Sequence, residues 1–208
     1  MLHLFFARHG ETIWNTQNRM QGRQDTELTD LGRQQAHLLG RKLADLTFDQ
    51  VYLSPAPRAR KTASLAFDQA GTGLPATLIT DERVQEMDLG TWEGLSMDEV
   101  KQADSINFDH FMHKPESFIP TGTGETFTEV SQRIADFLQD MERLGQQCLQ
   151  DDTEKRILLI SHNITLKSLL ALMKRWPLPK LREGPPLKQA ELYHAVYQQD
   201  GSWLIETP

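Results

Sequence analysis

Residues 2–12 read Leu-His-Leu-Phe-Phe-Ala-Arg-His-Gly-Glu-Thr, a short apolar run that ends in an Arg-His-Gly turn. The first six of these residues do not alternate with polar ones, which predicts a strand buried on both faces of a sheet. A second such run, Ile157–Ile160, precedes Ser-His-Asn at 161–163. In parallel α/β sheets, ligands bind beyond the carboxyl ends of the strands. We therefore expect His9 and His162, 153 residues apart, to lie at one sheet edge.

Predicted strands and helices alternate along the rest of the chain. This order predicts an α/β fold, a three-layer sandwich with a mostly parallel central sheet and helices on both faces. Residues 1–208 are expected to form one domain, in which 96–124 is a lid-like insertion of weak periodicity. The expected strands lie at Phe48–Leu53 and Ala76–Thr80, with a late hairpin at Ala190–Tyr197 and Ser202–Ile205. The expected helices carry Ala36, Leu39, Leu43 and Leu46 after a cap at Thr29, then Ala59, Ala63 and Ala66–Phe67, then Phe127 to Leu144 after a Thr126-x-x-Glu129 capping box, and finally the stretch from Asn163 to about Arg175.

Composition narrows the class of protein. The chain of 208 residues has a net charge of −7, which argues against a general nucleic-acid or anionic-membrane binder. One cysteine, Cys148, cannot form an intrachain disulfide or a cysteine-based zinc site. No apolar run approaches the roughly 20 residues of a membrane span, and the first strand does not resemble a signal peptide. We expect a cytoplasmic enzyme with no nucleic-acid partner and no membrane attachment.

The Arg-His-Gly-Glu-Thr motif is followed by an ordered series of companion motifs. Together they resemble the histidine phosphatase superfamily, the enzymes similar to phosphoglycerate mutase and acid phosphatase. A lone Arg-His-Gly is weak evidence for this family, whereas the ordered set of motifs is strong evidence and extends across nearly the whole chain. The companions are Asn15; Gln21-Gly22; Leu28-Thr29-x-x-Gly32; Ser54-x-x-x-Arg58-Ala59-x-x-Thr62-Ala63; Glu86-x-x-x-Gly90-x-Trp92-Glu93-Gly94; Gly124-Glu125-Thr126; and Ser161-His162.

The resemblance implies a mechanism of phosphoryl transfer that requires no metal and no cofactor. His9 would be the nucleophile that forms a phosphohistidine, and Glu86 the general acid and base. Arg8 and Arg58 would complete the catalytic set together with His162, which as a cation would be a third charged donor. Guanidinium forks suit phosphate oxygens in a way that lysine does not reproduce. The residues expected to contact a small phosphorylated substrate are Arg8, Asn15, Gln21, Gly22, Arg58, His162 and Asn163.

Two departures from the family pattern bear on function. The mutase branch follows its acidic residue with an Arg and soon a Tyr, which hold the substrate carboxylate, but here Met87 and Leu89 are apolar. Asp88 adds a negative charge that would repel an acid substrate. We therefore expect a phosphomonoesterase rather than a phosphoglycerate mutase. Asn163 stands where many relatives have Gly or Ala, and its longer side chain would either crowd the phosphate or point away.

Other interpretations stay open at this stage. A catalytically weak regulator would bind a phosphorylated partner in the same pocket, and measured turnover would distinguish it from an enzyme. His110 and His113 have the spacing of a metal pair, so a metal-dependent hydrolase would lose activity in chelator. The substrate classes that fit are sugar phosphates, phosphoglycolytic acids, nucleotide esters and phosphorylated ribazole. The late hairpin and exposed apolar residues are surfaces that a homodimer could use.

Overall fold

A computed structural model describes residues 1–75, 78–184 and 186–206. Within these ranges a sheet of six strands has the order β3-β2-β4-β1-β5-β6. The first four strands of that order pair in parallel, and β5 and β6 are antiparallel. The expected α/β class and mostly parallel sheet are confirmed. The strands are β1 (Leu2–Arg8), β2 (Gln50–Leu53), β3 (Leu78–Thr80), β4 (Lys155–Ser161), β5 (Leu192–Tyr197) and β6 (Trp203–Glu206).

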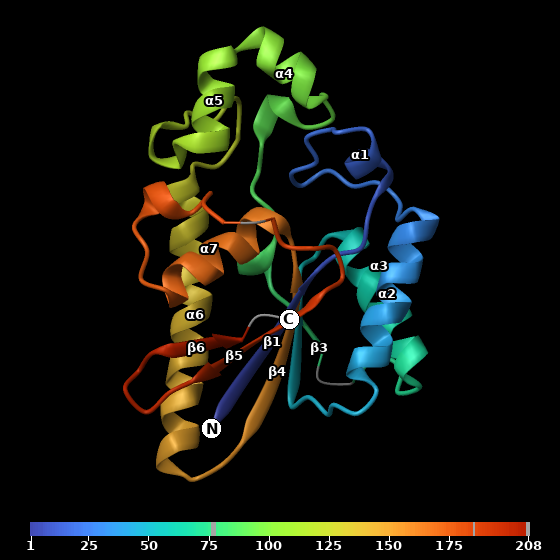
Figure 1. Cartoon of the computed structure of the whole chain (residues 1–208), viewed down its shortest axis with the longest axis vertical. Helices are drawn as coiled ribbons and strands as arrows, with labels where there is room; N and C mark the ends of the chain where they lie inside the picture. Colours follow the sequence, from blue (N-terminus) through green and yellow to red (C-terminus); the bar gives the residue numbers. More distant parts are fainter. Residues whose placement is uncertain (76–77, 185, 207–208) are drawn as a thin grey trace.

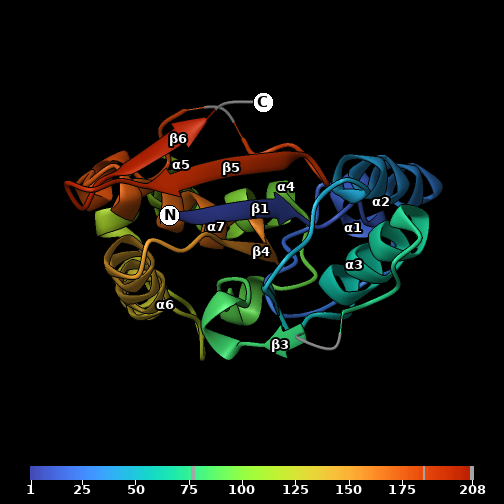
Figure 2. The ribbon, with the colours of Figure 1, turned by 90° about the horizontal axis from the view of Figure 1, so that it is seen from below.

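Helices cover both faces of the sheet, as Figures 1 and 2 show. Ile157 and Leu159 of β4 belong to the core that includes residues of α6 and α7, whereas Leu158 and Ile160 belong to the core with α2 and α3. Burial on both faces explains why this strand is continuously apolar. The helices are α1 (Ile13–Thr16), α2 (Asp30–Leu43), α3 (Pro57–Ala70), α4 (Met97–Ala103), α5 (Ser105–His113), α6 (Phe127–Gln150) and α7 (Asn163–Met173).

Most expected elements are confirmed, with differences at their ends. Thr29 caps α2 by accepting a hydrogen bond from Gly32 N, and Thr126 forms the expected capping box of α6. The α2 helix ends at Leu43, so Leu46 was wrongly placed in it. Leu46 instead follows a turn and packs against the core between α2 and α3, which explains its place in the apolar pattern. The expected strand at 76–80 begins at Leu78 in the structure, and its residues 76–77 lie outside the described ranges.

The segment 96–124 lies beyond the carboxyl ends of the parallel strands (Figure 1). It contains α4 and α5, which begin at side-chain caps from Ser96 and Asp104. Phe111 and Phe118 pack against Trp92 at ring-centroid distances of 5.6 and 5.3 Å, so aromatic packing holds the lid on the core. None of the described helices combines the length and apolar character that a membrane span needs.

Candidate active site

The pairing of β1 with β4 brings the two predicted histidines together. Arg8 stands opposite Ser161 in the parallel register, and His9 N donates a hydrogen bond to Ser161 O at 3.0 Å. The imidazole rings of His9 and His162 are 5.2 Å apart between centroids. Both follow the carboxyl end of their strand, where parallel sheets bind ligands.

The His9 ring has two chemically different nitrogens. Its Nδ1 lies 2.7 Å from Gly10 O, which can only accept, so Nδ1 carries the proton and Nε2 holds a free lone pair. Thr62 Oγ1 holds the turn by accepting a hydrogen bond from Gly10 N at 3.0 Å. Burial lowers the pKa of His9 well below 6.5, and the charges of Arg58 and Arg8 lower it further. His9 is therefore a neutral imidazole with a nucleophilic nitrogen.

Arg58 is fixed by its own hydrogen bonds. Its side chain is almost fully buried and its Nη1 donates to Gln24 O at 2.7 Å and to Asp25 Oδ1 at 2.8 Å. Its Nη2 donates to Gly22 O at 2.7 Å. Among the described residues its buried Nε has no hydrogen-bond partner. Gly22 holds this arrangement at φ +54°, where a Cβ would lie 2.0 Å from Glu93 Oε1.

Burial favours a neutral His162 ring rather than the cationic donor expected from the sequence. Its Nε2 lies 2.6 Å from Ser54 Oγ, and its buried Nδ1 has no partner in the described part of the chain. Burial lowers the pKa of His162 well below 6.5, and Arg58 and His9 add to that effect. A hydroxyl can donate or accept, so the contact with Ser54 fits either tautomer of the neutral ring.

The Glu86 carboxylate lies at the N-terminus of α7. Its Oε1 accepts from Met87 N at 3.0 Å and Thr165 N at 3.3 Å, and its Oε2 accepts from Ile164 N at 3.3 Å. Backbone donors at this helix end are therefore used to orient Glu86, a role that the sequence did not indicate. The oriented Glu86 carboxylate and the His9 imidazole line the same cavity.

Arg133 of α6 anchors the segment that carries Glu86. Its guanidinium donates to the carbonyls of Arg83, Gln85 and Glu86 at 2.6, 2.8 and 3.2 Å. It also pairs with Glu125 at 2.9 Å, which gives the Gly-Glu-Thr motif a structural purpose. Sequence reasoning missed Arg133 because a single arginine on a long amphipathic helix is ordinarily solvated.

His9, Arg58 and Glu86 line one cavity of about 130 Å³. Asn15 and Gln21 contribute amides whose oxygens accept from Thr12, and the Gln21 nitrogen is buried with no partner among the described residues. His162 does not line the cavity, and its ring lies next to that of His9 at an interplanar angle of 57°. Sequence reasoning missed the lid-side arginines Arg19 and Arg182. The predicted residues on its wall are Arg8, His9, Asn15, Gln21, Gly22, Arg58, Glu86 and Asn163.

The expected repulsion of acid substrates by Asp88 is not found. Asp88 accepts from Gly90 N at 2.8 Å and lies 3.5 Å from Arg23, and it does not line the cavity. Its carboxylate points toward the backbone of its own turn and stabilises that turn. Met87 is fully buried and Leu89 lines the cavity, so neither side chain offers the substrate a polar group.

The His110 and His113 pair has no third ligand in the described ranges, where no three His, Cys, Asp or Glu side chains gather as a cation site. Both residues lie on α5 of the lid. The donors that the cavity does present are guanidinium and amide N–H groups, which suit an anion rather than a metal ion.

Comparison with known proteins agrees with this geometry. The chain belongs to the histidine phosphatase superfamily (branch 1), whose family model matches residues 4–207. YhfR of Bacillus stearothermophilus is 34% identical, with a TM-score of 0.85 over 100% of this chain and 96% of that one. The alpha-ribazole phosphatase of Shigella flexneri is 27% identical, with a TM-score of 0.83 over 99% and 95%. The "Probable phosphoglycerate mutase GpmB" of Yersinia pestis (strain Pestoides F) is 29% identical over 100% of this chain and 92% of its own length.

Proposed function

We propose that the protein is a phosphomonoesterase that hydrolyses a small phosphorylated metabolite through a phosphohistidine on His9. The observation that carries this proposal is the hydrogen bond from His9 Nδ1 to Gly10 O, which leaves Nε2 as a nucleophile inside an arginine-lined cavity. Arg8 has a buried Nε with no partner among the described residues, like that of Arg58. Two such donors suit the equatorial oxygens of a transferring phosphoryl group.

The reaction proceeds in two balanced steps. In the first, His9 Nε2 bonds to phosphorus as the bond from phosphorus to the ester oxygen breaks, and the protonated Glu86 carboxyl gives its proton to the leaving alcohol. In the second, Glu86 takes a proton from water as the water oxygen bonds to phosphorus and the bond to Nε2 breaks. Inorganic phosphate leaves, and both residues return to their initial state.

Hydrolysis is favoured over mutase activity by the wall beside Glu86. Met87 is buried and Leu89 is apolar, so neither position provides the carboxylate contacts that a mutase has there. Similarity to the alpha-ribazole phosphatase of Shigella flexneri also supports hydrolysis. The second candidate is a phosphoglycerate mutase, which the similarity to the Yersinia pestis protein favours. Incubation with 3-phosphoglycerate separates them, because a phosphatase releases phosphate and a mutase forms 2-phosphoglycerate.

The proposal is tested by hydrolysis of p-nitrophenyl phosphate in chelator, with the wild type beside His9→Ala. The wild type should turn over and form an acid-labile phosphoenzyme, whereas His9→Ala should lose about 10⁴-fold or more in kcat. Retained turnover in His9→Ala would exclude His9 as the nucleophile. A folded wild type that binds phosphate but forms no phosphoenzyme with any ester would instead be a regulator.

A further inference from the structure

The lid side of the cavity carries an arginine that the steps above do not use. Arg182 follows the short helix Leu178–Lys180 and lines the cavity together with His9 and Glu86. We propose that Arg182 binds a carboxylate on the leaving group of the substrate, so that the natural substrate is a phosphorylated carboxylic acid. This inference rests on the proposed phosphatase function and names its substrate class.

Arg182 is held in place without losing its hydrogen-bonding capacity. Its guanidinium carbon lies 4.8 Å from the Phe111 ring centroid and 6.0 Å from that of Phe127, which fixes its plane by stacking. Its hydrogen bonds are weak ones to Met112, at 3.4 Å to the carbonyl oxygen and 3.3 Å to Sδ. No carboxylate of the described residues lies within 4 Å of its nitrogens, so its charge has no ion-pair partner in that part of the chain.

Arg182 is placed at the leaving-group end of the cavity. Its guanidinium lies over the ring of Phe111, a residue of the lid helix α5, and it lines the cavity together with Glu86, the proposed proton donor to the leaving oxygen. Arg8 and His9, at the phosphoryl end, instead lie at the carboxyl end of β1. The side chain that neighbours the leaving group is thus a guanidinium over Phe111, and the one acid that shares the described cavity wall with it is Glu86.

The chemistry of this end favours a carboxylate. A guanidinium fork matches a carboxylate with two parallel hydrogen bonds, which are stronger where water is partly excluded. Arg19, the other lid-side arginine, is already engaged, because it donates to Gly94 O at 2.6 Å and lies 3.8 Å from Glu99. A cavity of about 130 Å³ suits a compact acid of a few carbons. With Asp88 turned away, no acid of the described cavity wall except Glu86 opposes such a substrate.

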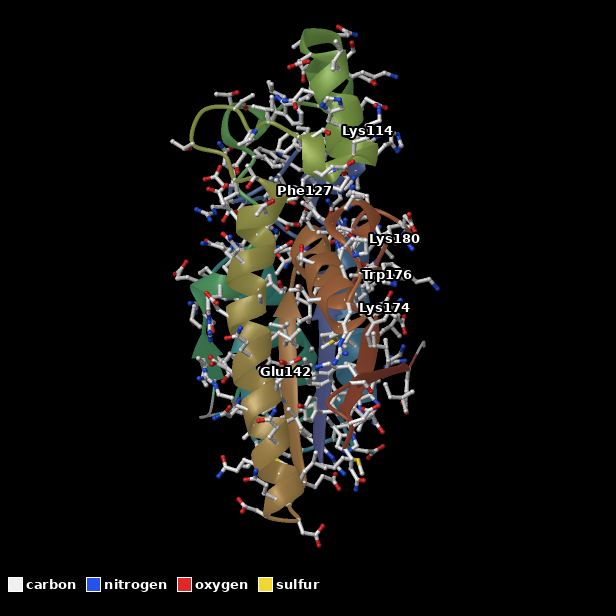
Figure 3. The ribbon with its side chains drawn as sticks, turned by 90° about the vertical axis from the view of Figure 1, so that its left-hand side faces the viewer. Lys114, Phe127, Glu142, Lys174, Trp176 and Lys180 are labelled. Carbon is white, nitrogen blue, oxygen red and sulfur yellow. The ribbon has the colours of Figure 1, made fainter. Side chains whose placement is uncertain are left out.

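The test compares two esters that differ only at the relevant group, 3-phosphoglycerate and glycerol 3-phosphate, by the rate of phosphate release. The wild type should prefer the acid, and Arg182→Ala should lower the ratio of the two kcat/KM values by about 10- to 100-fold. Arg182→Gln keeps a long stem on Phe111 and should lower the ratio too, which separates loss of charge from loss of packing. Lys180→Ala is the matched control, since Lys180 is exposed on the side drawn in Figure 3 and lies outside the cavity.

An unchanged ratio in both Arg182 variants would overturn the assignment, as would a change of equal size in Lys180→Ala. If the wild type hydrolyses neither ester nor p-nitrophenyl phosphate, the proposed function fails separately from this inference. Calorimetric binding of both esters to His9→Ala and to His9→Ala with Arg182→Ala then decides the role of Arg182. The acid should lose about 10-fold or more in affinity relative to glycerol 3-phosphate, and equal losses would contradict the inference.

Discussion

Single side chains in this site are prepared by hydrogen bonds that determine which of their nitrogens is free. Gly10 O selects the proton position on His9, and the contact with Ser54 Oγ occupies Nε2 of His162. Three oxygens hold the terminal nitrogens of Arg58 and leave its Nε available. Groups fixed in this way need little reorganisation when charge develops on a transferring phosphoryl group, which is the usual origin of large electrostatic catalysis.

Arg58→Lys tests this argument at the residue scale. An ammonium cannot satisfy Gly22 O, Gln24 O and Asp25 together and also reach the phosphate, so kcat/KM for p-nitrophenyl phosphate should fall about 100-fold. Arg60→Lys on the same helix is the control, because Arg60 is exposed and does not line the cavity. Equal kinetics in Arg58→Lys and the wild type would show that a point charge suffices and that the fork has no role.

At the element scale, α6 acts on the chemistry although none of its residues lines the cavity. Arg133 ties this helix to the segment that carries Glu86 through three carbonyls, and Glu125 completes the tie at the helix N-terminus. On the opposite side, the first turn of α7 orients the Glu86 carboxylate. Glu86 is therefore held between two helices, and its position depends on both.

Arg133→Ala should misplace Glu86 and so impair protonation of the leaving group. The loss in kcat should be about 10- to 100-fold for an alkyl phosphate and smaller for p-nitrophenyl phosphate, whose leaving group needs less protonation. Arg133→Lys should recover part of the loss, and Gln132→Ala, at the exposed neighbouring position, should behave like the wild type. Losses of equal size with both esters would indicate a merely structural role for Arg133.

The elements that the sequence predicted well are those whose apolar pattern reports burial. The β1 and β4 strands and the capped helices α2 and α6 follow their patterns closely. The lid helices were not predicted individually, because they pack a few aromatic residues around Trp92 rather than a regular apolar stripe. Arg133 and Arg182 were missed because their roles depend on contacts between segments far apart in the chain, which no local pattern encodes.

At the scale of the whole molecule, strand order rather than local sequence forms the site. The motifs predicted which residues matter, whereas the β1–β4 pairing determines that His9 and His162 share one buried position. That position has a thermodynamic consequence, because two imidazoles are buried there beside Arg8 and Arg58 and both have lowered pKa values. A protein that keeps such groups neutral loses stability at pH values at which the same groups are protonated in the unfolded chain.

The free energy of unfolding should therefore fall as pH decreases below about 6.5, the ordinary histidine pKa. Above that pH neither state binds a proton at His9 or His162. Below that pH the unfolded chain binds protons at these two histidines and the folded chain does not. The free energy of unfolding then falls by about 1.4 kcal/mol per pH unit for each histidine, until the pH reaches the lowered pKa of the folded state. Urea unfolding between about pH 5 and pH 7.5 measures this slope.

The variants His9→Gln and His162→Gln should each reduce that slope by about one histidine's share, whereas His113→Gln, at an exposed lid position, should keep the wild-type slope. His3 has a lowered pKa as well and is unchanged in all three variants, so it contributes a constant background. If both buried-site variants kept the full slope, the two imidazoles would be as easily protonated in the folded protein as in the unfolded chain. The neutral nucleophile on which the proposed mechanism depends would then be contradicted by an equilibrium measurement that needs no substrate.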